Sequence, residues 1–484
     1  MVRRLRLLTV LLVGFATIVV LVWSPREGSR NDDSYDVDVS GHIARPPERI
    51  AAPGAVARPK PNVLLVTIDT LRPDHLTAYG YARATSPNLD RIAAEGVLFE
   101  TAYAPMSTTG PSHATLFTSR YPLGHGVVRN GIPLSEELPV LPAILAEHGY
   151  RTAAFVSSYP VSRHFGFARG FAHFDDDFSG VASMGLASWN GRSVEGGFDR
   201  LGSDTVDRAI AWIATQAQDQ PWFVWVHLFD PHAPYLAPAP RGETFKSPGA
   251  TARQALVDAY DGEILYADTS LGRLSEASQA DAGNRGLLTI VTSDHGEAFW
   301  EHGWNGHNRN LFDEEVRVPL IMHWRGRIAA GQRIGEPVSL VDLFPTVLAA
   351  TEVVASDLTE DGIDLLPAIV GNRRIDSDRA LYLQRPVRDR SPRRRHKPAA
   401  SFGVRKGNWK LVNGRKARRS LLFDLEADPG ETRDLSYAEP ERAAELAAQI
   451  ATWSQVEAAN APARDTNPVP EEVERKLRAL GYAD

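Results

Sequence analysis

Residues 63 to 69 read Val-Leu-Leu-Val-Thr-Ile-Asp, and they give the first indication of the fold class. Its apolar and β-branched residues form an unbroken run, which predicts a strand that is buried on both faces. Runs of the same kind recur at Thr152-Ala153-Ala154-Phe155-Val156, Trp222-Phe223-Val224-Trp225-Val226-His227 and Leu287-Leu288-Thr289-Ile290-Val291-Thr292. Helical patterns lie between them, for example at 88–95 and 204–215. Buried strands that alternate with helices predict an α/β fold, a three-layer αβα sandwich with a mostly parallel central sheet.

Polar residues follow the first and the last of these strands. Asp69 comes directly after the first strand, and Asp294 and His295 come closely after the last one. In a parallel sheet the functional groups gather beyond the carboxyl ends of the strands. Two carboxylates, an imidazole and a hydroxyl suit a hard or borderline divalent cation, such as Ca, Mn, Mg or Zn. We therefore expect Asp69, Asp294 and His295, together with Thr109, to bind one divalent metal ion of unknown identity.

Thr109 precedes Gly110-Pro111-Ser112, which is typical of a helix start with proline in its first turn. A hydroxyl at a helix N-terminus lies in a region of partial positive charge, close to free backbone N–H groups. Those groups favour an alkoxide and can hold anionic oxygens. Taken alone, Thr109 is better explained as an ordinary N-cap threonine. Its combination with the acidic residues after the strands favours a catalytic nucleophile.

Composition limits the classes of function. The chain has 484 residues, of which 43% are hydrophobic and 23% charged, and its formal net charge is −7. It is long enough for one large domain and a smaller one. The mildly acidic balance gives no reason to expect a nucleic-acid partner. Because the chain contains no cysteine, disulfides and thiolate metal ligands are excluded.

The N-terminus has the charge pattern of a membrane anchor. Three arginines at positions 3, 4 and 6 precede an apolar run at 7–23, which would form about 26 Å of helix. A cleaved signal peptide is the alternative, but the following residues make a poor cleavage site. We expect an uncleaved anchor at 1–23 and a flexible, proline-rich tether at 24–60. The catalytic body would then be membrane-anchored and extracytoplasmic, in the periplasm or at the cell surface.

The segment Thr109-Gly110-Pro111-Ser112-His113-Ala114-Thr115-Leu116-Phe117-Thr118-Ser119-Arg120-Tyr121-Pro122 resembles the sulfatase signature C/S-x-P-S-R-x-x-L-x-T-G-R-x-P. Other segments are similar to the same family, which belongs to the alkaline phosphatase superfamily: Ser86-Pro87-Asn88-Leu89-Asp90-Arg91, Asp230-Pro231-His232-Ala233-Pro234-Tyr235, Ser293-Asp294-His295-Gly296-Glu297, Glu301-His302-Gly303 and Asp342-Leu343-Phe344-Pro345-Thr346. The resemblance implies a catalytic domain at 61–375. It also implies a small C-terminal α+β subdomain, with a terminal helix, at 376–484.

The departures from the family pattern concern the chemistry. Sulfatases use a formylglycine made from cysteine or serine, and Thr109 cannot give that aldehyde. The signature arginine is replaced by His113, and the lysine expected after Glu-His-Gly is replaced by His307. The family's Gly-Lys-Trp-His-Leu-Gly segment is missing. A threonine nucleophile beside one metal is similar to phosphoglycerol and phosphoethanolamine transferases and to phosphodiesterases of the superfamily.

The resemblance and the residue types suggest further site residues. His232 resembles the family histidine that contacts the ester or the leaving group, where it could act as a general acid. His302 and His307 lie in a loop rich in glycine and asparagine, and we expect one of them to contact the substrate. Arg72 and Arg120 could hold anionic oxygens, although structural or solvated arginines are equally consistent with the sequence. His113, in the place of the signature arginine, is a further candidate for substrate binding.

The expected function is therefore a metal-dependent hydrolase of sulfate or phosphate esters. It would use Thr109 as nucleophile, and it would favour phosphate esters. One alternative is a membrane-anchored transferase of the phosphoglycerol or phosphoethanolamine type. Another is a non-catalytic member of the family that binds ligands. The expected partners are an ester substrate and, through residues 1–23, a membrane.

Overall fold

The computed structural model describes residues 59–179, 188–189, 192–193, 198–216, 219–356, 358–371, 373–385, 401–413, 420–462 and residue 475. The predicted anchor at 1–23 and nearly all of the predicted tether at 24–60 lie outside the described residues. No helix within the described part of the chain has both the length and the apolarity to cross a bilayer. The anchor and the tether therefore stay predictions.

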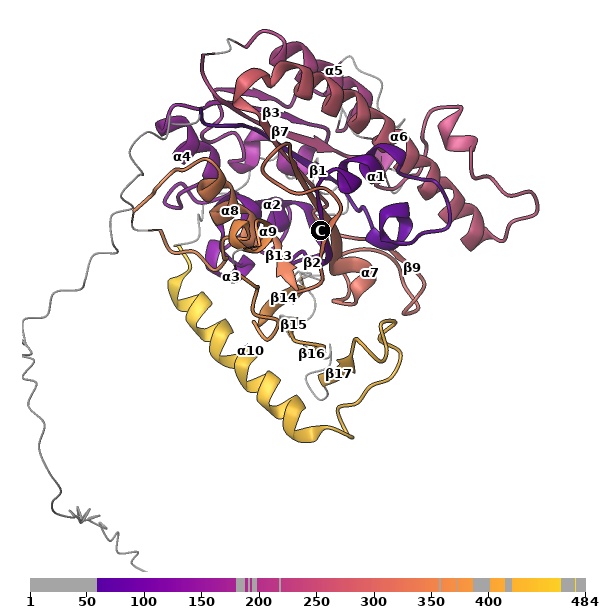
Figure 1. Cartoon of the computed structure of the whole chain (residues 1–484). Coiled ribbons are helices and arrows are strands. Elements are labelled where there is room, and N and C mark those ends of the chain that lie inside the picture. Colours follow the sequence, from indigo (N-terminus) through magenta and orange to yellow (C-terminus); the bar gives the residue numbers. More distant parts are fainter. Residues whose placement is uncertain are drawn as a thin grey trace, which may run out of the picture. The chain divides into compact units, whose positions relative to one another are not determined.

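The core of the protein is a twisted sheet with strand order β12-β2-β11-β8-β1-β7-β3-β4, to which β13 adds beside β2 (Figure 1). Strand β11 runs antiparallel to both of its neighbours, and all other pairs are parallel. The strands are β1 Asn62–Ile68, β2 Val97–Tyr103, β3 Arg151–Val156, β4 His173–Asp175, β7 Trp222–Leu228, β8 Leu287–Thr292, β11 Arg317–Trp324, β12 Gln332–Ile334 and β13 Val338–Ser339. The prediction of a mostly parallel sheet is confirmed.

Helices cover both faces of this sheet. Alternate residues of β1 belong to different hydrophobic clusters, because successive side chains of a strand point to opposite faces. Val63 and Leu65 pack on the face covered by α2, α4 and α8, whereas Leu64 and Val66 pack on the face covered by α1, α5 and α6. The helices of the two layers are α1 Pro87–Ala94, α2 Thr109–Thr118, α3 Pro122–His125, α4 Leu141–Glu147, α5 Gly202–Ile213, α6 Ala252–Asp281, α8 Leu343–Ala350 and α9 Leu366–Ile369. The three-layer αβα sandwich is thereby confirmed.

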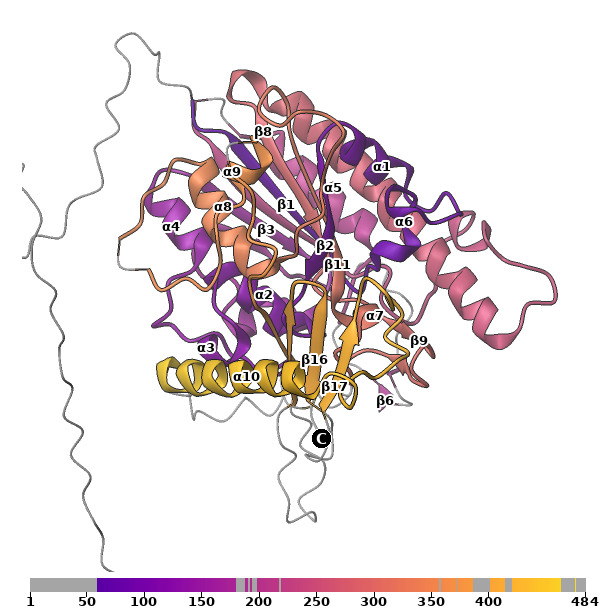
Figure 2. The same cartoon turned by 60° about the horizontal axis from the view of Figure 1, so that its bottom comes forward.

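A second, antiparallel sheet follows near the C-terminus, in the order β14-β15-β16-β17 (Figure 2). Its strands are β14 Leu381–Arg385, β15 Ser401–Lys406, β16 Trp409–Asn413 and β17 Ser420–Asp424. The helix α10 (Pro440–Asn460) packs on it through Leu446 and Ile450, which cluster with Val404, Leu411 and Leu422. This is the α+β architecture that the family resemblance implied for the C-terminal part.

The carboxyl ends of β1 and β8 lie side by side, because the two strands pair in parallel from Asn62↔Leu287 to Thr67↔Thr292. The loops after these strands carry Asp69, Asp294 and His295. Two short elements follow β8 in the sequence. They are the hairpin of β9 (Ala298–Phe299) and β10 (Asn305–Gly306) and the helix α7 (Asp313–Val316). The sheet therefore brings the expected metal ligands to one edge.

Candidate active site

Asp69, Asp294 and His295 form one buried cluster. One potential ligand atom of each residue lies within 4.8 Å of the other two. The Nε2 atom of His295 lies 3.6 Å from Asp69 Oδ1 and 3.6 Å from Asp294 Oδ2. All three side chains are buried. The strand-end argument thus brought together residues that are more than two hundred positions apart in the sequence.

The polar atoms of this cluster fit a cation. Within the described residues, both oxygens of Asp69 and Oδ2 of Asp294 lack a hydrogen bond of ordinary geometry. Burial, together with the neighbouring Asp294, raises the pKa of Asp69 well above its usual value. Burial raises the pKa of Asp294 to about 6. Buried carboxylate oxygens without partners are costly unless a proton or a metal ion neutralises them.

His295 is oriented as a metal ligand. Its Nδ1 lies 2.9 Å from the backbone oxygen of Gly296, which places the ring proton on Nδ1 and a lone pair on Nε2. Burial lowers the pKa of His295 to about 3, so the ring is neutral near pH 7. The donor set of two carboxylates and one neutral imidazole suits a divalent ion such as Ca, Mn, Mg or Zn.

Thr109 is the first residue of α2, and Thr108 is its N-cap. The hydroxyl of Thr109 lies 3.5 Å from His295 Nε2, at the edge of the cluster of Asp69, Asp294 and His295. We call these three side chains the metal cluster, because they are the candidate metal ligands. The Thr109 hydroxyl is also close enough to Asp69 to offset part of the rise in the pKa of that carboxyl that burial causes. The structure therefore places the predicted nucleophile beside the predicted metal ligands.

Few backbone N–H groups at the start of α2 remain for a ligand. The N–H of Gly110 donates to Asn130 Oδ1 at 2.7 Å, Pro111 has no N–H, and that of Ser112 donates to the oxygen of Thr108 at 3.1 Å. Among the residues that the structure describes, the N–H of Thr109 has no hydrogen-bond acceptor. The Nδ2 group of the buried Asn130 has no hydrogen-bond partner in the described residues. Asn130 is thus a second donor that could face a substrate oxygen.

His113, which replaces the signature arginine, has protein partners at both ring nitrogens. Its Nδ1 lies 2.8 Å from the backbone oxygen of Thr109, and its Nε2 lies 2.9 Å from the hydroxyl of Thr67. The same hydroxyl lies 3.0 Å from Trp225 Nε1 and 3.2 Å from His227 Nδ1. A single proton arrangement satisfies all these contacts, with the hydroxyl of Thr67 donating to His113 and accepting from the other two rings. His113 then has no N–H to offer a substrate.

Three histidine rings adjoin one another near Thr109. The ring centroid of His307 lies 4.5 Å from that of His295 and 5.0 Å from that of His232. Glu297 is 3.1 Å from His307 Nδ1, and it accepts a hydrogen bond from the hydroxyl of Tyr235 at 3.1 Å. Burial lowers the pKa of His232 to about 3, so its resting form is neutral. The two predicted catalytic histidines therefore lie together beside the metal cluster.

The other predicted substrate-binding residues have different surroundings. Arg72 donates to the carboxylates of Asp74 and Glu301 and to the backbone oxygen of Glu297. His302 contacts Glu314 and stacks on the ring of Phe312. These two residues therefore hold the loop between β8 and α7 in place through protein contacts.

Arg120 lies at the other end of α2 from Thr109. It forms ion pairs with Asp361 at 3.5 Å and with Glu457 of α10 at 3.8 Å. Thr109 is the first of the ten residues of α2, and Arg120 follows the last of them, so the rise of the helix separates the two by about 15 Å, beyond the reach of the Arg120 side chain. Arg120 connects α2 to the C-terminal helix α10 instead of facing the cluster of Asp69, Asp294 and His295.

Sequence reasoning did not single out Asn130 or His227 as site residues. His227 lies 3.6 Å from Asp69 and 3.0 Å from the hydroxyl of Ser158. Its signal was present in the sequence, because it lies near the carboxyl end of a predicted strand, as Asp69 does. Asn130 lies in a loop beyond α3, and no sequence pattern places it beside Gly110.

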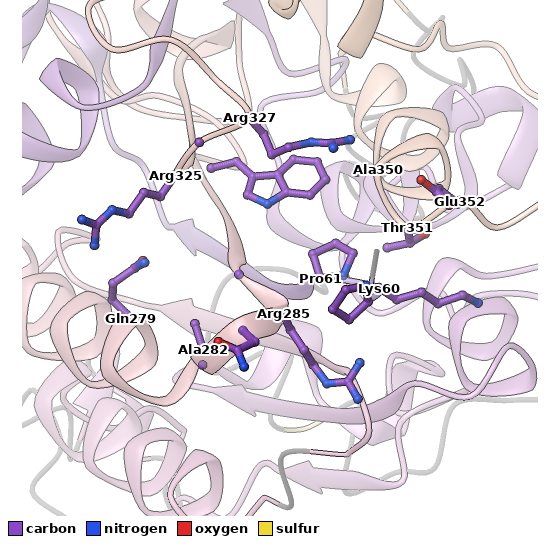
Figure 3. A pocket seen from close by; sticks show the side chains of 16 residues that line it. Lys60, Pro61, Gln279, Ala282, Arg285, Arg325, Arg327, Ala350, Thr351 and Glu352 are labelled. Carbon is purple, nitrogen blue, oxygen red and sulfur yellow. The ribbon is translucent and has the colours of Figure 1, made fainter. Parts of the chain in front are cut away.

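A cavity of about 420 Å³ lies at the opposite edge of the sheet. Figure 3 shows Lys60, Arg285, Arg325 and Arg327 around it. It adjoins the amino ends of β1 and β8, whereas the metal cluster follows their carboxyl ends. This cavity is therefore separate from the candidate active site.

Comparison with known families gave two matches. Residues 61–353 match the Sulfatase family model. Residues 300–457 match a model described as N-sulphoglucosamine sulphohydrolase, C-terminal. Together the two matches cover the central sheet, the candidate site and the C-terminal sheet.

Individual relatives agree with these matches. The N-acetylgalactosamine-6-sulfatase of Homo sapiens is 27% identical over 481 residues, which cover 85% of this chain and 88% of the relative. Arylsulfatase A of Bos taurus is 27% identical over 469 residues, covering 79% and 85%. Among solved structures, the phosphonate monoester hydrolase of Agrobacterium radiobacter has a TM-score of 0.67 at 23% identity, covering 82% of this chain and 96% of that one. A structure in complex with its substrate D-glucosamine-2-N,6-O-disulfate has a TM-score of 0.68 at 21% identity, covering 85% and 100%.

Proposed function

Because this chain belongs to the sulfatase family, and is thus a hydrolase of sulfuric or phosphoric esters, we propose that it uses Thr109 as its nucleophile and prefers phosphate esters. The proposal rests on one observation, the hydroxyl of Thr109 beside the buried cluster of Asp69, Asp294 and His295. Relatives and structural neighbours include sulfate-ester and phosphonate-ester hydrolases. The choice between the two kinds of ester therefore depends on this chain's own residues.

The residues present assign a role to each side chain. Asp69, Asp294, His295 and Thr109 would hold one divalent ion, which when bound stabilises negative charge on the nucleophile and on the ester oxygens. The oxygen of Thr109 forms a bond to phosphorus, and its proton passes to a water molecule, because Asp69 must stay ionised to hold the ion. The bond from phosphorus to the leaving alcohol breaks. Water then cleaves the ester bond to Thr109 and restores its hydroxyl.

The leaving oxygen needs a proton, and His307 is well placed to supply it. Glu297 fixes the orientation of the His307 ring and would balance a positive charge on it. The ring centroid of His232 lies 5.0 Å from that of His307. We assign His232 as the second histidine that can donate a proton to the leaving oxygen. Asn130 Nδ2 and the amide of Thr109 are the donors left for the ester's non-bridging oxygens.

The charge of the site favours esters with a single negative charge. In the described part of the chain, no lysine or arginine bonds to Thr109, Asp294 or His295. The arginine of the family signature is replaced by His113, which burial keeps neutral by lowering its pKa. A phosphate monoester carries two negative charges near pH 7, and a phosphodiester carries one. Among phosphate esters, we therefore propose a phosphodiester as the preferred class of substrate.

The test is a panel of aryl esters that share one leaving group. Bis-(p-nitrophenyl) phosphate, p-nitrophenyl phosphate and p-nitrophenyl sulfate are compared by kcat/KM with Mn, Mg, Ca and Zn. We expect the diester to be the best substrate. Thr109→Ala should abolish turnover, and Thr109→Ser should retain part of it. Hydrolysis of the sulfate ester alone, or a wild-type rate for Thr109→Ala, would refute the proposal.

We also propose that the protein is membrane-anchored and extracytoplasmic. The support is the order of residues at the N-terminus, where arginines precede an apolar run. Cell fractionation tests this proposal. Recovery of the full-length chain in the cytoplasmic soluble fraction would contradict it.

A further inference from the structure

Lys410 is a fully buried lysine that the proposed reaction does not use. It lies on β16 of the C-terminal sheet, with 0% of its surface exposed. Its Nζ lies 2.7 Å from Asp313 Oδ1 and 2.8 Å from Glu431 Oε1. Lysine is almost never buried in this way unless it is paired. We call Lys410, Asp313 and Glu431 the Lys410 triad.

The triad connects the C-terminal sheet to α7 of the catalytic body. Asp313 is the first residue of α7, and its N–H donates to Glu431 Oε2 at 2.6 Å. The hydroxyl of Tyr103, on β2 of the central sheet, donates to Asp313 at 2.9 Å. In both Figure 1 and Figure 2, α7 lies beside the C-terminal strands and close to β9. The start of α7 is therefore held from both sheets.

The helix α7 in turn holds the loop that carries His307. Glu315, which is fully buried, accepts hydrogen bonds from the N–H groups of Arg309 at 3.0 Å and of Asn310 at 3.2 Å. Next to them, Asn308 has a φ of 70° and accepts a hydrogen bond from the hydroxyl of Thr108. Thr108 is the N-cap of α2, directly before the nucleophile.

A second contact ties the same loop to the triad. His302 Nε2 lies 3.2 Å from the backbone oxygen of Glu431, and its Nδ1 lies 2.7 Å from Glu314 Oε1. Glu431 itself has a φ of 52°, in the left-handed region that non-glycine residues rarely occupy. The loop between β9 and α7 is thus fixed at both of its ends by groups that contact the C-terminal sheet.

We propose that Lys410 is a positioning residue, which acts through α7 to hold His307 and Asn308 against the nucleophile. The proposal rests on the proposed function. Stability alone explains the triad poorly, since well-packed apolar residues in place of a buried ion pair are often as stable or more stable. Directional bonds from a lysine and two carboxylates specify one orientation of α7. The C-terminal sheet is then part of the catalytic apparatus as well as of the fold.

The test uses a pair of substitutions that removes the lysine without leaving a surplus charge. Lys410→Met with Glu431→Gln takes away one positive and one negative charge, and Asp313 keeps Arg405 as its nearby cation. Lys410→Arg is the conservative variant. The matched control is Lys406→Met with Glu445→Gln, an exposed pair 3.3 Å apart between the same sheet and α10. All variants are assayed as the full chain on the ester that the wild type cleaves best, and their thermal unfolding is recorded.

For Lys410→Met with Glu431→Gln, we expect a fall in kcat of about 10²-fold with little change in KM, since a small misplacement remote from the chemistry has effects of this size. Lys410→Arg should keep more of the wild-type kcat than Lys410→Met with Glu431→Gln does. The control pair should have the kcat of the wild type. A variant that unfolds at the wild-type temperature and keeps its kcat would overturn the inference.

A double-mutant cycle with His307→Ala distinguishes positioning from general loosening. The cycle combines His307→Ala with the pair Lys410→Met and Glu431→Gln. If Lys410 acts by holding His307, this combined variant should have a kcat no lower than that of His307→Ala alone. Additive losses would overturn the inference, and so would a His307→Ala variant with the wild-type rate. An inactive wild type would instead contradict the proposed function. The two proposals therefore fail by different results.

Discussion

Replacing Asp294 by asparagine should stabilise the metal-free protein. Asp294 is 1% exposed, and burial raises the pKa of its carboxyl from 3.8 to about 6. Because the folded-state pKa is above the unfolded one, the ionised group destabilises the fold at high pH. The penalty is absent below the unfolded pKa, grows between the two values and is constant above about 6.

The size of the effect follows from the shift. A difference of roughly two pKa units corresponds to about 3 kcal/mol at pH 8, and about half of that remains at pH 5. Asparagine keeps the acceptor used by the N–H groups of His295 at 2.9 Å and Thr70 at 3.4 Å. Its amide group then lies where Oδ2 was, 3.6 Å from the Nε2 atom of His295, which carries a lone pair. The substitution therefore removes charge without removing hydrogen bonds.

The assay is urea unfolding of both proteins in EDTA at pH 5 and pH 8, repeated with saturating Mn or Ca. In EDTA at pH 8 the Asp294→Asn variant should be the more stable by up to about 3 kcal/mol. With metal, the wild type should gain about 3 kcal/mol at a hundredfold excess over Kd, and the variant should gain much less. A variant that is less stable than the wild type in EDTA at pH 8 would refute the reasoning.

Three further predictions use other parts of the structure. Arg379 forms a bidentate ion pair with the buried Asp342, at 2.8 and 2.5 Å, so Arg379→Met should lower the free energy of unfolding by about 3–5 kcal/mol in urea titrations. Asn130→Ala should lower it by about 1–3 kcal/mol and also reduce kcat, because the N–H of Gly110 loses its acceptor and the substrate loses a donor. Removal of residues 1–58 should leave the urea midpoint unchanged, since the central sheet begins at Asn62.

The strands and the cluster of candidate metal ligands were predictable because their signals are local. An unbroken apolar run indicates a buried strand, and parallel pairing then brings the residues after β1 and β8 to one edge. Asp69, Asp294 and His295 could be grouped on this basis without any knowledge of the loops. Strand β11 was not predicted, and its antiparallel direction depends on the path of the chain after α7.

The surroundings of individual side chains were not predictable, because they depend on partners that are distant in sequence. Arg72 carries the same charge whether it binds a substrate or the carboxylates of Asp74 and Glu301, and only the fold selects between them. Arg120 is a partial exception. A helix that starts at Thr109 and ends at Thr118 already places Arg120 about 15 Å from Thr109.

The replacement of the signature arginine by His113 involves more than one position. Thr67 and His227 are paired residues of the neighbouring strands β1 and β7. The hydroxyl of Thr67 contacts both the ring of His113 and the ring of His227. An arginine introduced at 113 would therefore meet two rings and a hydroxyl whose hydrogen bonds are already matched. It would also bring a buried charge with Asp294 as its nearest carboxylate, 3.9 Å from the present ring. His113, Thr67 and His227 form one hydrogen-bonded group without net charge. A positively charged side chain that binds anions could therefore be introduced here only by changing all three positions.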